Sequence, residues 1–216
     1  MSDLTVILAN GDFPRRGGSA RRLLQSARRV VACDGAADLY RGAFGRDPDV
    51  IVGDLDSIAA PASPDAEVVR VAEQDTNDLT KAITLCRGRG WTELVIVGAT
   101  GKREDHTLGN IFRAMEAGVQ VVTDCGRFIP FECELKLELS AGAPISVFAT
   151  DPSTAMTSKG LAWPLDGVKF PNLYCATLNR AEGGSVEITA SHPSFVFLPS
   201  PKYKNFRNSR TTGSLA

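Results

Sequence analysis

The chain has 216 residues, and its 24 Lys and Arg against 25 Asp and Glu leave a formal net charge of −1. This balance argues against nucleic acid or an anionic membrane surface as a partner, and no apolar stretch approaches the length of a membrane span. The first residues form an apolar strand pattern without a basic leader, and the five cysteines are scattered with no C-x-x-C pair. We therefore expect a soluble, cytoplasmic protein with reduced thiols.

Short apolar runs alternate with helix-type spacing over the first 122 residues. The runs are continuous, as is typical of strands covered on both faces of a largely parallel sheet. They occupy residues 4–9, 29–33, 50–52, 68–71, 94–97 and 119–122. Helix-type spacing covers residues 19–27, 36–40, 76–87 and 107–117. The alternation predicts a Rossmann-like α/β domain.

The pattern changes near residue 126. Short alternating runs separated by Gly, Pro, Ser and Asn predict strands at 128–131, 135–139, 145–148, 174–178, 185–189 and 195–198. With no helical pattern between them, these runs indicate a smaller antiparallel β-sandwich. We predict an α/β domain at 1–125, a β-sandwich domain at 126–200 and a basic, flexible tail at 201–216.

Polar residues and glycines follow nearly every predicted strand of the first domain. In chain order they are Asn10-Gly11-Asp12, Asp34-Gly35, Gly53-Asp54-Leu55-Asp56, Gln74-Asp75 and residues 98–103. Ligands of open α/β sheets bind outside the carboxyl ends of the strands. The recurrence therefore predicts a binding cleft at this edge of the sheet.

Two carboxylates follow the third strand directly. If the extended geometry persists past Gly53, Asp54 and Asp56 point the same way. The alternative is a turn, in which such side chains bond their own backbone.

A second acidic group begins the helical pattern near residue 76. Asp75 and Asp78 share a helix face and could flank one ion, and Lys81 on that face could reach a carboxylate or a phosphate. The alternatives are acidic capping of a helix N-terminus and an ordinary ion pair between Lys81 and Asp78.

These carboxylates would repel one another unless a cation neutralised them. Oxygen-only ligands suit Mg²⁺, which shares its remaining positions with water and substrate phosphates. The working hypothesis is therefore a Mg²⁺-nucleotide site with the ligands Asp54, Asp56, Asp75 and Asp78.

The segment after the fifth strand adds positive charge. Lys102 and Arg103 stand beside a predicted helix N-terminus, which is a weak phosphate-binding pattern when taken alone. Asp105 and His106 suggest a general base, and the alternative is a hydrogen-bonded pair that caps the helix.

Four segments together resemble, in order and spacing, the motifs of the thiamine pyrophosphokinase family. They are C-D-G-A at 33–36, G-D-L-D-S-I at 53–58, Q-D-T-N-D-L-T-K at 74–81 and G-K-R-E-D-H at 101–106. In the second domain, T-S-K-G-L-A-W-P-L at 157–165 is similar to a further segment of that family. The resemblance covers most of residues 5–198.

The resemblance implies transfer of a pyrophosphoryl group from ATP to the hydroxyl of thiamine, which gives thiamine diphosphate and AMP. It also implies dependence on Mg²⁺. The family is homodimeric, with each site completed across the interface by the β domain, and we expect the same here.

The resemblance also implies roles for individual residues. The catalytic candidates are Asp54, Asp56, Asp78, Lys81 and Asp105, with Asp78 or Asp105 as the proton acceptor. The ATP-binding candidates are Asp34, Gly35, Lys102 and Arg103. The thiamine-binding candidates are Gln74, Trp163 and Asn179. The alternative for Trp163 is a plain core or interface aromatic.

The chain departs from the family pattern at two places. Leu178 stands where the family has a serine before Asn179, and Lys102-Arg103-Glu104 stands where G-R-x is commoner. The first departure keeps a second interpretation open, a Mg²⁺-dependent pyrophosphokinase or phosphotransferase with another acceptor. A third interpretation is a thiamine- or nucleotide-binding module without turnover.

Overall fold

A computed structural model describes residues 3–56, 58–59, 61–73 and 75–200. The chain divides into two compact units, Met1–Asp124 and Cys125–Ala216. The candidate Gln74 and the tail predicted at 201–216 lie outside the described residues. Within the part that the structure describes, no helix combines the length and the apolar character needed to cross a membrane.

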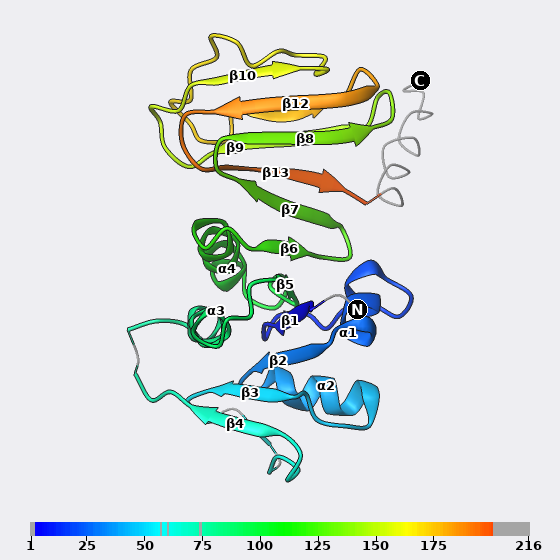
Figure 1. The fold of residues 1–216 in the computed structure, drawn as a ribbon, viewed down its shortest axis with the longest axis vertical. Coiled ribbons are helices and arrows are strands. Elements are labelled where there is room, and N and C mark those ends of the chain that lie inside the picture. The colour runs from blue at the N-terminus through cyan, green and yellow to red at the C-terminus, as the bar shows by residue number, and fades with distance from the viewer. Residues whose placement is uncertain (1–2, 57, 60, 74, 201–216) are drawn as a thin grey trace, which may run out of the picture. The chain divides into compact units, whose positions relative to one another are not determined.

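The first unit contains a six-stranded parallel sheet (Figure 1). Its strands are β1 (Thr5–Leu8), β2 (Arg29–Cys33), β3 (Val50–Gly53), β4 (Glu67–Arg70), β5 (Leu94–Val97) and β6 (Gln120–Val122). They pair in the order β6-β5-β1-β2-β3-β4. β1 and β3 are buried along their whole length and β2 at four of its five residues, which explains why their sequences are continuous apolar runs rather than alternating ones. The edge strand β4 has no buried residue.

Helices cover both faces of this sheet. α1 (Ser19–Ser26) and α2 (Ala36–Phe44) lie on one face, and α3 (Asp78–Gly88) and α4 (Glu104–Glu116) lie on the other (Figure 1). The first pair packs on a core that includes Leu24 and Tyr40, both nearly inaccessible to solvent. α2 ends at Gly45, whose φ of 69° is a left-handed conformation that glycine adopts without a steric penalty.

The direction of strand addition reverses at β1. From β1 the sheet grows through β2 and β3 on one side, and through β5 and β6 on the other. In doubly wound sheets such a reversal opens a crevice at the carboxyl ends of the two central strands. The fold therefore directs a ligand to the loops that follow β1 and β5.

The second unit consists of two antiparallel sheets. One has the order β11-β9-β13-β7 and the other the order β10-β12-β8. The strands are β7 (Gly126–Phe131), β8 (Glu134–Leu139), β9 (Pro144–Ala149), β10 (Met156–Lys159), β11 (Ala176–Arg180), β12 (Gly184–Ala190) and β13 (Ser194–Pro199).

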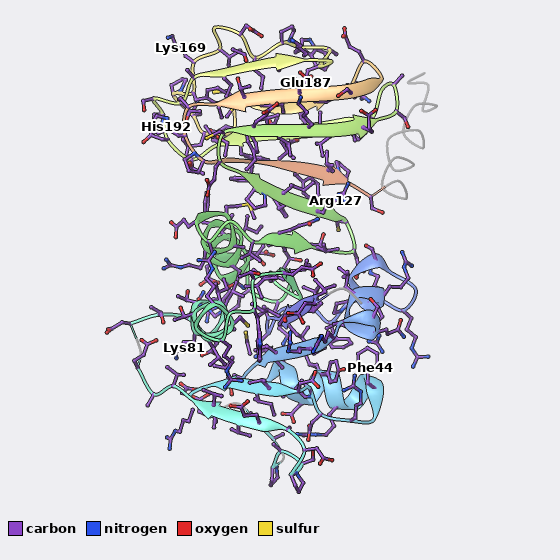
Figure 2. All side chains as sticks on the ribbon, viewed as in Figure 1. Phe44, Lys81, Arg127, Lys169, Glu187 and His192 are labelled. Atoms are coloured by element: carbon purple, nitrogen blue, oxygen red, sulfur yellow. The ribbon has the colours of Figure 1, made fainter. Side chains whose placement is uncertain are left out.

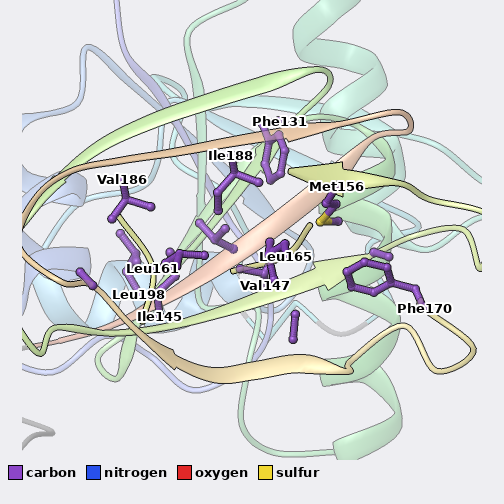
Figure 3. Packing of buried hydrophobic residues seen from close by; sticks show 14 residues of the cluster. Phe131, Ile145, Val147, Met156, Leu161, Leu165, Phe170, Val186, Ile188 and Leu198 are labelled. Carbon is purple, nitrogen blue, oxygen red and sulfur yellow. The ribbon is translucent and has the colours of Figure 1, made fainter. Parts of the chain in front are cut away.

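A separate apolar core lies between these two sheets. Figure 3 shows side chains from both meeting there, among them Val147 from β9 and Ile188 from β12. Phe170, from the long connection between β10 and β11, is completely buried in the same cluster. The predicted fold class, an α/β domain followed by an antiparallel β domain, is confirmed.

Some predicted element bounds differ from the structure. The helix expected from residue 107 begins earlier, at Glu104. The prediction missed its first turn because that turn is polar and carries no apolar periodicity. β10 was not predicted, since its sequence M-T-S-K buries only the methionine side chain. The strand expected at 174–178 is β11 at Ala176–Arg180, where a bulge interrupts the alternation.

Candidate functional site

The first unit has a cleft of about 380 Å³ at the carboxyl ends of its strands. The loops after β1 and β5 and the N-terminal turn of α3 contribute most of its wall, as the strand order leads one to expect. Its lining residues are Ala9, Asn10, Gly11, Cys33, Asp54, Thr76, Asn77, Asp78, Leu79, Lys81, Ala99, Gly101, Lys102, Arg103, His106 and Asn110.

Three carboxylates form a compact group beside this cleft. One oxygen from each of Asp34, Asp54 and Asp56 lies within 4.8 Å of the other two. Asp34 follows β2 and the other two follow β3. The pairing of Cys33 with Val52 brings the two strand ends side by side, and the Asp34 main-chain N–H donates to the Val52 carbonyl at 2.9 Å.

The two β3 carboxylates do not approach each other through an extended chain. The strand ends at Gly53, Leu55 is left-handed with a φ of 70°, and the Asp56 N–H donates to Asp54 Oδ1 at 3.3 Å. Of the two arrangements considered for Asp54 and Asp56, the extended one does not occur. A turn brings the oxygens together instead.

Gly53 is required by the close approach of two acidic residues. A Cβ built there would lie 3.0 Å from the Asp34 Cβ and 3.4 Å from Asp78 Oδ1. The glycine thus lets β2, β3 and the start of α3 bring their carboxylates to one place. Asp34 itself has a φ of 44° and is buried, which is a conformation that aspartate tolerates better than most residues.

The α3 N-terminus places Asp78 and Lys81 on the cleft. Asn77 caps the helix, since its Oδ1 accepts from the Thr80 N–H at 3.0 Å. Lys81 is buried, and its Nζ lies 3.3 Å from Asp78 Oδ1; Figure 2 labels it on α3. The ion pair and the cleft-lining position were alternative predictions for Lys81, and the structure contains both.

Asp75 lies in the turn before α3 and is exposed. Its main-chain N–H donates to Glu73 Oε2 at 2.8 Å, and Thr76 donates to the same carboxylate. Among the described residues, the compact acidic group consists of Asp34, Asp54 and Asp56, and it does not include Asp75.

The loop after β5 supplies the basic side of the cleft. Lys102 Nζ donates to Asn10 Oδ1 at 2.8 Å, so the loops after β1 and β5 are tied together. Arg103 lines the cleft and pairs with Asp105, at 2.5 Å between Nη2 and Oδ2. Hydrogen bonding from Arg103 holds the pKa of Asp105 at about 2. Because Arg103 donates to both carboxylate oxygens of Asp105, from Nε at 3.1 Å and from Nη2 at 2.5 Å, the carboxylate orients the guanidinium.

Several cleft residues were not among the sequence candidates. Asn110 Nδ2 donates to the Ala99 carbonyl and its Oδ1 accepts from Asn77 Nδ2, both at 3.2 Å. This chain of bonds joins the end of β5 to the cap of α3. The only sequence signal for Asn110 is that it is a polar residue inside a helical pattern. Cys33 also lines the cleft, and burial raises the pKa of its thiol, so it presents a neutral group there.

The second unit has its own pocket, of about 360 Å³, between β11 and the segment around Trp163. Trp163 and Leu178 are exposed there, at 58% and 71%, whereas Asn179 is buried. The remaining lining residues are Pro164, Leu165, Val168, Cys175, Ala176 and Thr177. Trp163 is therefore not a core aromatic, because it is largely exposed and lines this pocket, and the interface-aromatic alternative stays a prediction.

Two family models match the chain, and together they cover most of it. The model described as "Thiamin pyrophosphokinase, catalytic domain" matches residues 20–123. The one described as "Thiamin pyrophosphokinase, substrate-binding domain" matches residues 126–197. Each match lies within one of the two compact units.

Named relatives agree with these matches. The chain is 31% identical to "Thiamine pyrophosphokinase 1" of Oryza sativa subsp. japonica over 165 residues, which is 66% of this chain and 62% of the relative. It is 32% identical to "Thiamin pyrophosphokinase 1" of Caenorhabditis elegans over 114 residues, 49% of this chain and 47% of the relative. The matches thus span less than two thirds of either relative's length.

A solved structure agrees at the level of the fold. Thiamin pyrophosphokinase from Candida albicans superposes with a TM-score of 0.72 at 18% identity, over 91% of this chain and 89% of that chain. At this identity the likeness concerns the fold alone. The two matched domains, the relatives and the motif order agree, and the chain belongs to the thiamin pyrophosphokinase family.

Proposed function

We propose that the protein transfers a pyrophosphoryl group from ATP to the hydroxyl of thiamine, giving thiamine diphosphate and AMP. Family membership supports this activity. The observation that carries it is the convergence of carboxylates from β2 and β3 beside a cleft that also holds two lysines and an arginine. This combination suits a polyphosphate with its counter-cation better than a neutral metabolite.

The acidic group fits Mg²⁺. Asp34, Asp54 and Asp56 offer oxygen ligands only, and their mutual distances are compatible with one small cation. When bound, Mg²⁺ would neutralise charge on the phosphate oxygens. Asp34, first assigned to the nucleotide alone, thus becomes a proposed metal ligand. Asp78 lies outside this compact group, so its role as a metal ligand rests on the family resemblance, and Asp75 is proposed only to support the turn.

The cations of the cleft would bind and orient the phosphate chain. Lys81 is held by Asp78, and Lys102 by Asn10, so their positions are set before a ligand arrives. Such fixed charges stabilise the charge that spreads over the equatorial phosphate oxygens during transfer. Arg103, oriented by Asp105, extends the same basic wall. Gly35 forms the N-cap of α2. Its proposed role in ATP binding rests on the family pattern alone.

The thiamine hydroxyl would attack the β-phosphorus while the bond to AMP breaks, and its proton must pass to a base. Of the two candidates, Asp78 lines the cleft and Asp105 does not. Both carboxylates pair with a cation, Asp78 with Lys81 and Asp105 with Arg103, so their positions alone distinguish them. We therefore assign the proton to Asp78.

The pocket of the second unit would receive the aromatic part of thiamine. The exposed indole of Trp163 offers a flat face to a cationic ring, an arrangement that stacking and cation–π attraction favour. The homodimer implied by the family resemblance remains a prediction, and sedimentation equilibrium tests it.

The decisive experiment measures AMP and thiamine diphosphate by chromatography, with purified protein, ATP, Mg²⁺ and thiamine. We expect turnover in the wild type and a loss of at least about 10³-fold in Asp54→Ala, because the phosphate charge loses its counter-cation. Asp65→Asn, a change at an exposed aspartate of the same unit, is the control and should retain activity. Circular dichroism verifies that both variants fold.

Three outcomes would separate the alternatives. AMP release with another alcohol acceptor but not with thiamine would favour a related phosphotransferase, to which the exposed Leu178 points. Ligand binding without AMP release would favour a binding module. Full activity in Asp54→Ala would remove the metal hypothesis.

A further inference from the structure

The buried amide of Asn179 holds both main-chain polar groups of Trp163. Its Oδ1 accepts from the Trp163 N–H at 3.2 Å and its Nδ2 donates to the Trp163 carbonyl at 2.7 Å. The same Oδ1 accepts from the Arg180 N–H at 2.8 Å. A flipped amide would direct its NH₂ group at two N–H donors, so the bonding pattern fixes the orientation.

A bulge in β11 explains why the asparagine faces inward. The register of β11 against β9 shifts between Ala176 and Asn179. At the bulge Leu178 has a φ of 62°, turns its side chain outward and donates its N–H to Ser146 Oγ at 3.1 Å. The next residue, Asn179, therefore turns under the pocket and is only 3% exposed.

The segment that carries Trp163 is fixed on both sides. Leu161 and Leu165 are buried in the core of the second unit, whereas Trp163 between them is 58% exposed. The Ala162 N–H donates to the Arg180 carbonyl at 2.9 Å, and the Leu165 N–H donates to Ser158 Oγ at 2.9 Å. At the middle of the segment, the bonds to Asn179 hold the residue whose indole lines the pocket.

We propose that Asn179 is a positioning residue for the acceptor ring, acting through Trp163 and making no contact with the acceptor. The proposal rests on the proposed function, because it takes thiamine as the acceptor. It differs from the direct thiamine contact that the family resemblance suggested. An amide with three protein bonds and almost no exposed surface has little left to offer a ligand.

The first test measures the indole directly. The chain has two tryptophans, so Trp91→Phe leaves Trp163 as the sole fluorescent indole. Asn179→Asp keeps the size but brings an oxygen against the Trp163 carbonyl, and Asn179→Ala removes all three bonds. We expect acrylamide quenching to rise by up to about 1.7-fold, the ratio of full exposure to the present 58%. Asn172→Asp, at an exposed asparagine of the same unit, should leave quenching unchanged.

The second test uses kinetics in the full-length enzyme. In Asn179→Asp we expect the KM for thiamine to rise about tenfold with kcat nearly unchanged, because ring binding weakens while the phosphate site is intact. In the Trp163→Ala background the same substitution should have no further effect on KM, since a residue that acts through Trp163 has nothing left to position.

These results distinguish the alternatives. Unchanged quenching in both Asn179 variants would overturn the proposal. So would a KM effect that persists in the Trp163→Ala background, because it would indicate a direct contact with thiamine. If the wild type shows no turnover with thiamine, the proposed function fails, but the quenching measurement still decides whether Asn179 holds Trp163.

Discussion

Replacing Gly53 with alanine tests whether the convergence of acidic groups depends on close packing at the end of β3. The new Cβ would lie 3.0 Å from the Asp34 Cβ, which is a few tenths of an ångström shorter than an ordinary contact. Asp34 has little freedom to move away, because it is buried and its N–H is bonded to Val52. Strain and displacement must therefore be shared between β2 and β3.

Overpacking of this kind costs about 1 to 3 kcal/mol of unfolding free energy. For a unit the size of Met1–Asp124, each kcal/mol lowers the melting temperature by about 3 to 5 °C. A shift of several tenths of an ångström in Asp34 should also lower kcat/KM by about tenfold or more, because binding geometries of this type tolerate about 0.5 Å.

Gly42→Ala is the matched control. Gly42 lies inside α2, and a Cβ there would meet nothing within 4 Å. The same chemical change should therefore stabilise the protein, by about 0.5 to 1 kcal/mol, because alanine favours a helix more than glycine does. Calorimetry on both variants tests whether Gly53→Ala lowers and Gly42→Ala raises the unfolding free energy, and the AMP assay tests whether only Gly53→Ala loses activity. Wild-type stability and activity in Gly53→Ala would refute the reasoning.

Three further predictions follow from the same contacts. Lys81→Met should lower turnover by about 10²-fold with the fold retained, because it removes a buried charge from the cleft; the AMP assay with circular dichroism checks it. Burial opposes ionisation of Asp47, but bonds from the Ser63 N–H and from Arg41 lower its pKa overall. The stabilisation that ionised Asp47 contributes is fully present above its unfolded pKa near 3.9 and is lost as the pH falls through the lower folded pKa. Urea titrations below about pH 4 should therefore show a steeper loss of unfolding free energy in the wild type than in Asp47→Asn. Leu178→Gly should raise the unfolding free energy by about 0.5 kcal/mol, since glycine relieves the positive φ while little buried area is lost; an unchanged or lower urea midpoint would contradict this.

Much of the first unit could be predicted from periodicity and from the residues that follow each strand. Continuous apolar runs indicated buried parallel strands, and Asp34, Asp54 and Lys102 all stand at strand ends. The partner of Asp54 and Asp56 could not be predicted from spacing. Asp34 joins them because β2 and β3 are neighbours in the sheet, and strand order is a property of tertiary packing.

The second unit was harder to predict in detail. A bulge turns Leu178 outward and Asn179 inward, and a strict alternation of two cannot anticipate such an extra residue. The family pattern singled out Asn179 as a thiamine-binding candidate, and that role stays a prediction. Its hydrogen bonds to the main chain of Trp163 depend on a contact between segments 16 residues apart, which no local pattern encodes.

Separate cores in the two units have an evolutionary consequence. Substitutions around Leu178 change a pocket whose stability depends on the apolar cluster of the second unit, and that cluster shares no residue with the one beneath α1 and α2. If the proposed function holds, selection can therefore alter the acceptor pocket without disturbing the core that supports the cleft of the first unit. Homologues with a different acceptor would then be expected to carry sequence differences along β11 and to keep the carboxylates after β2 and β3.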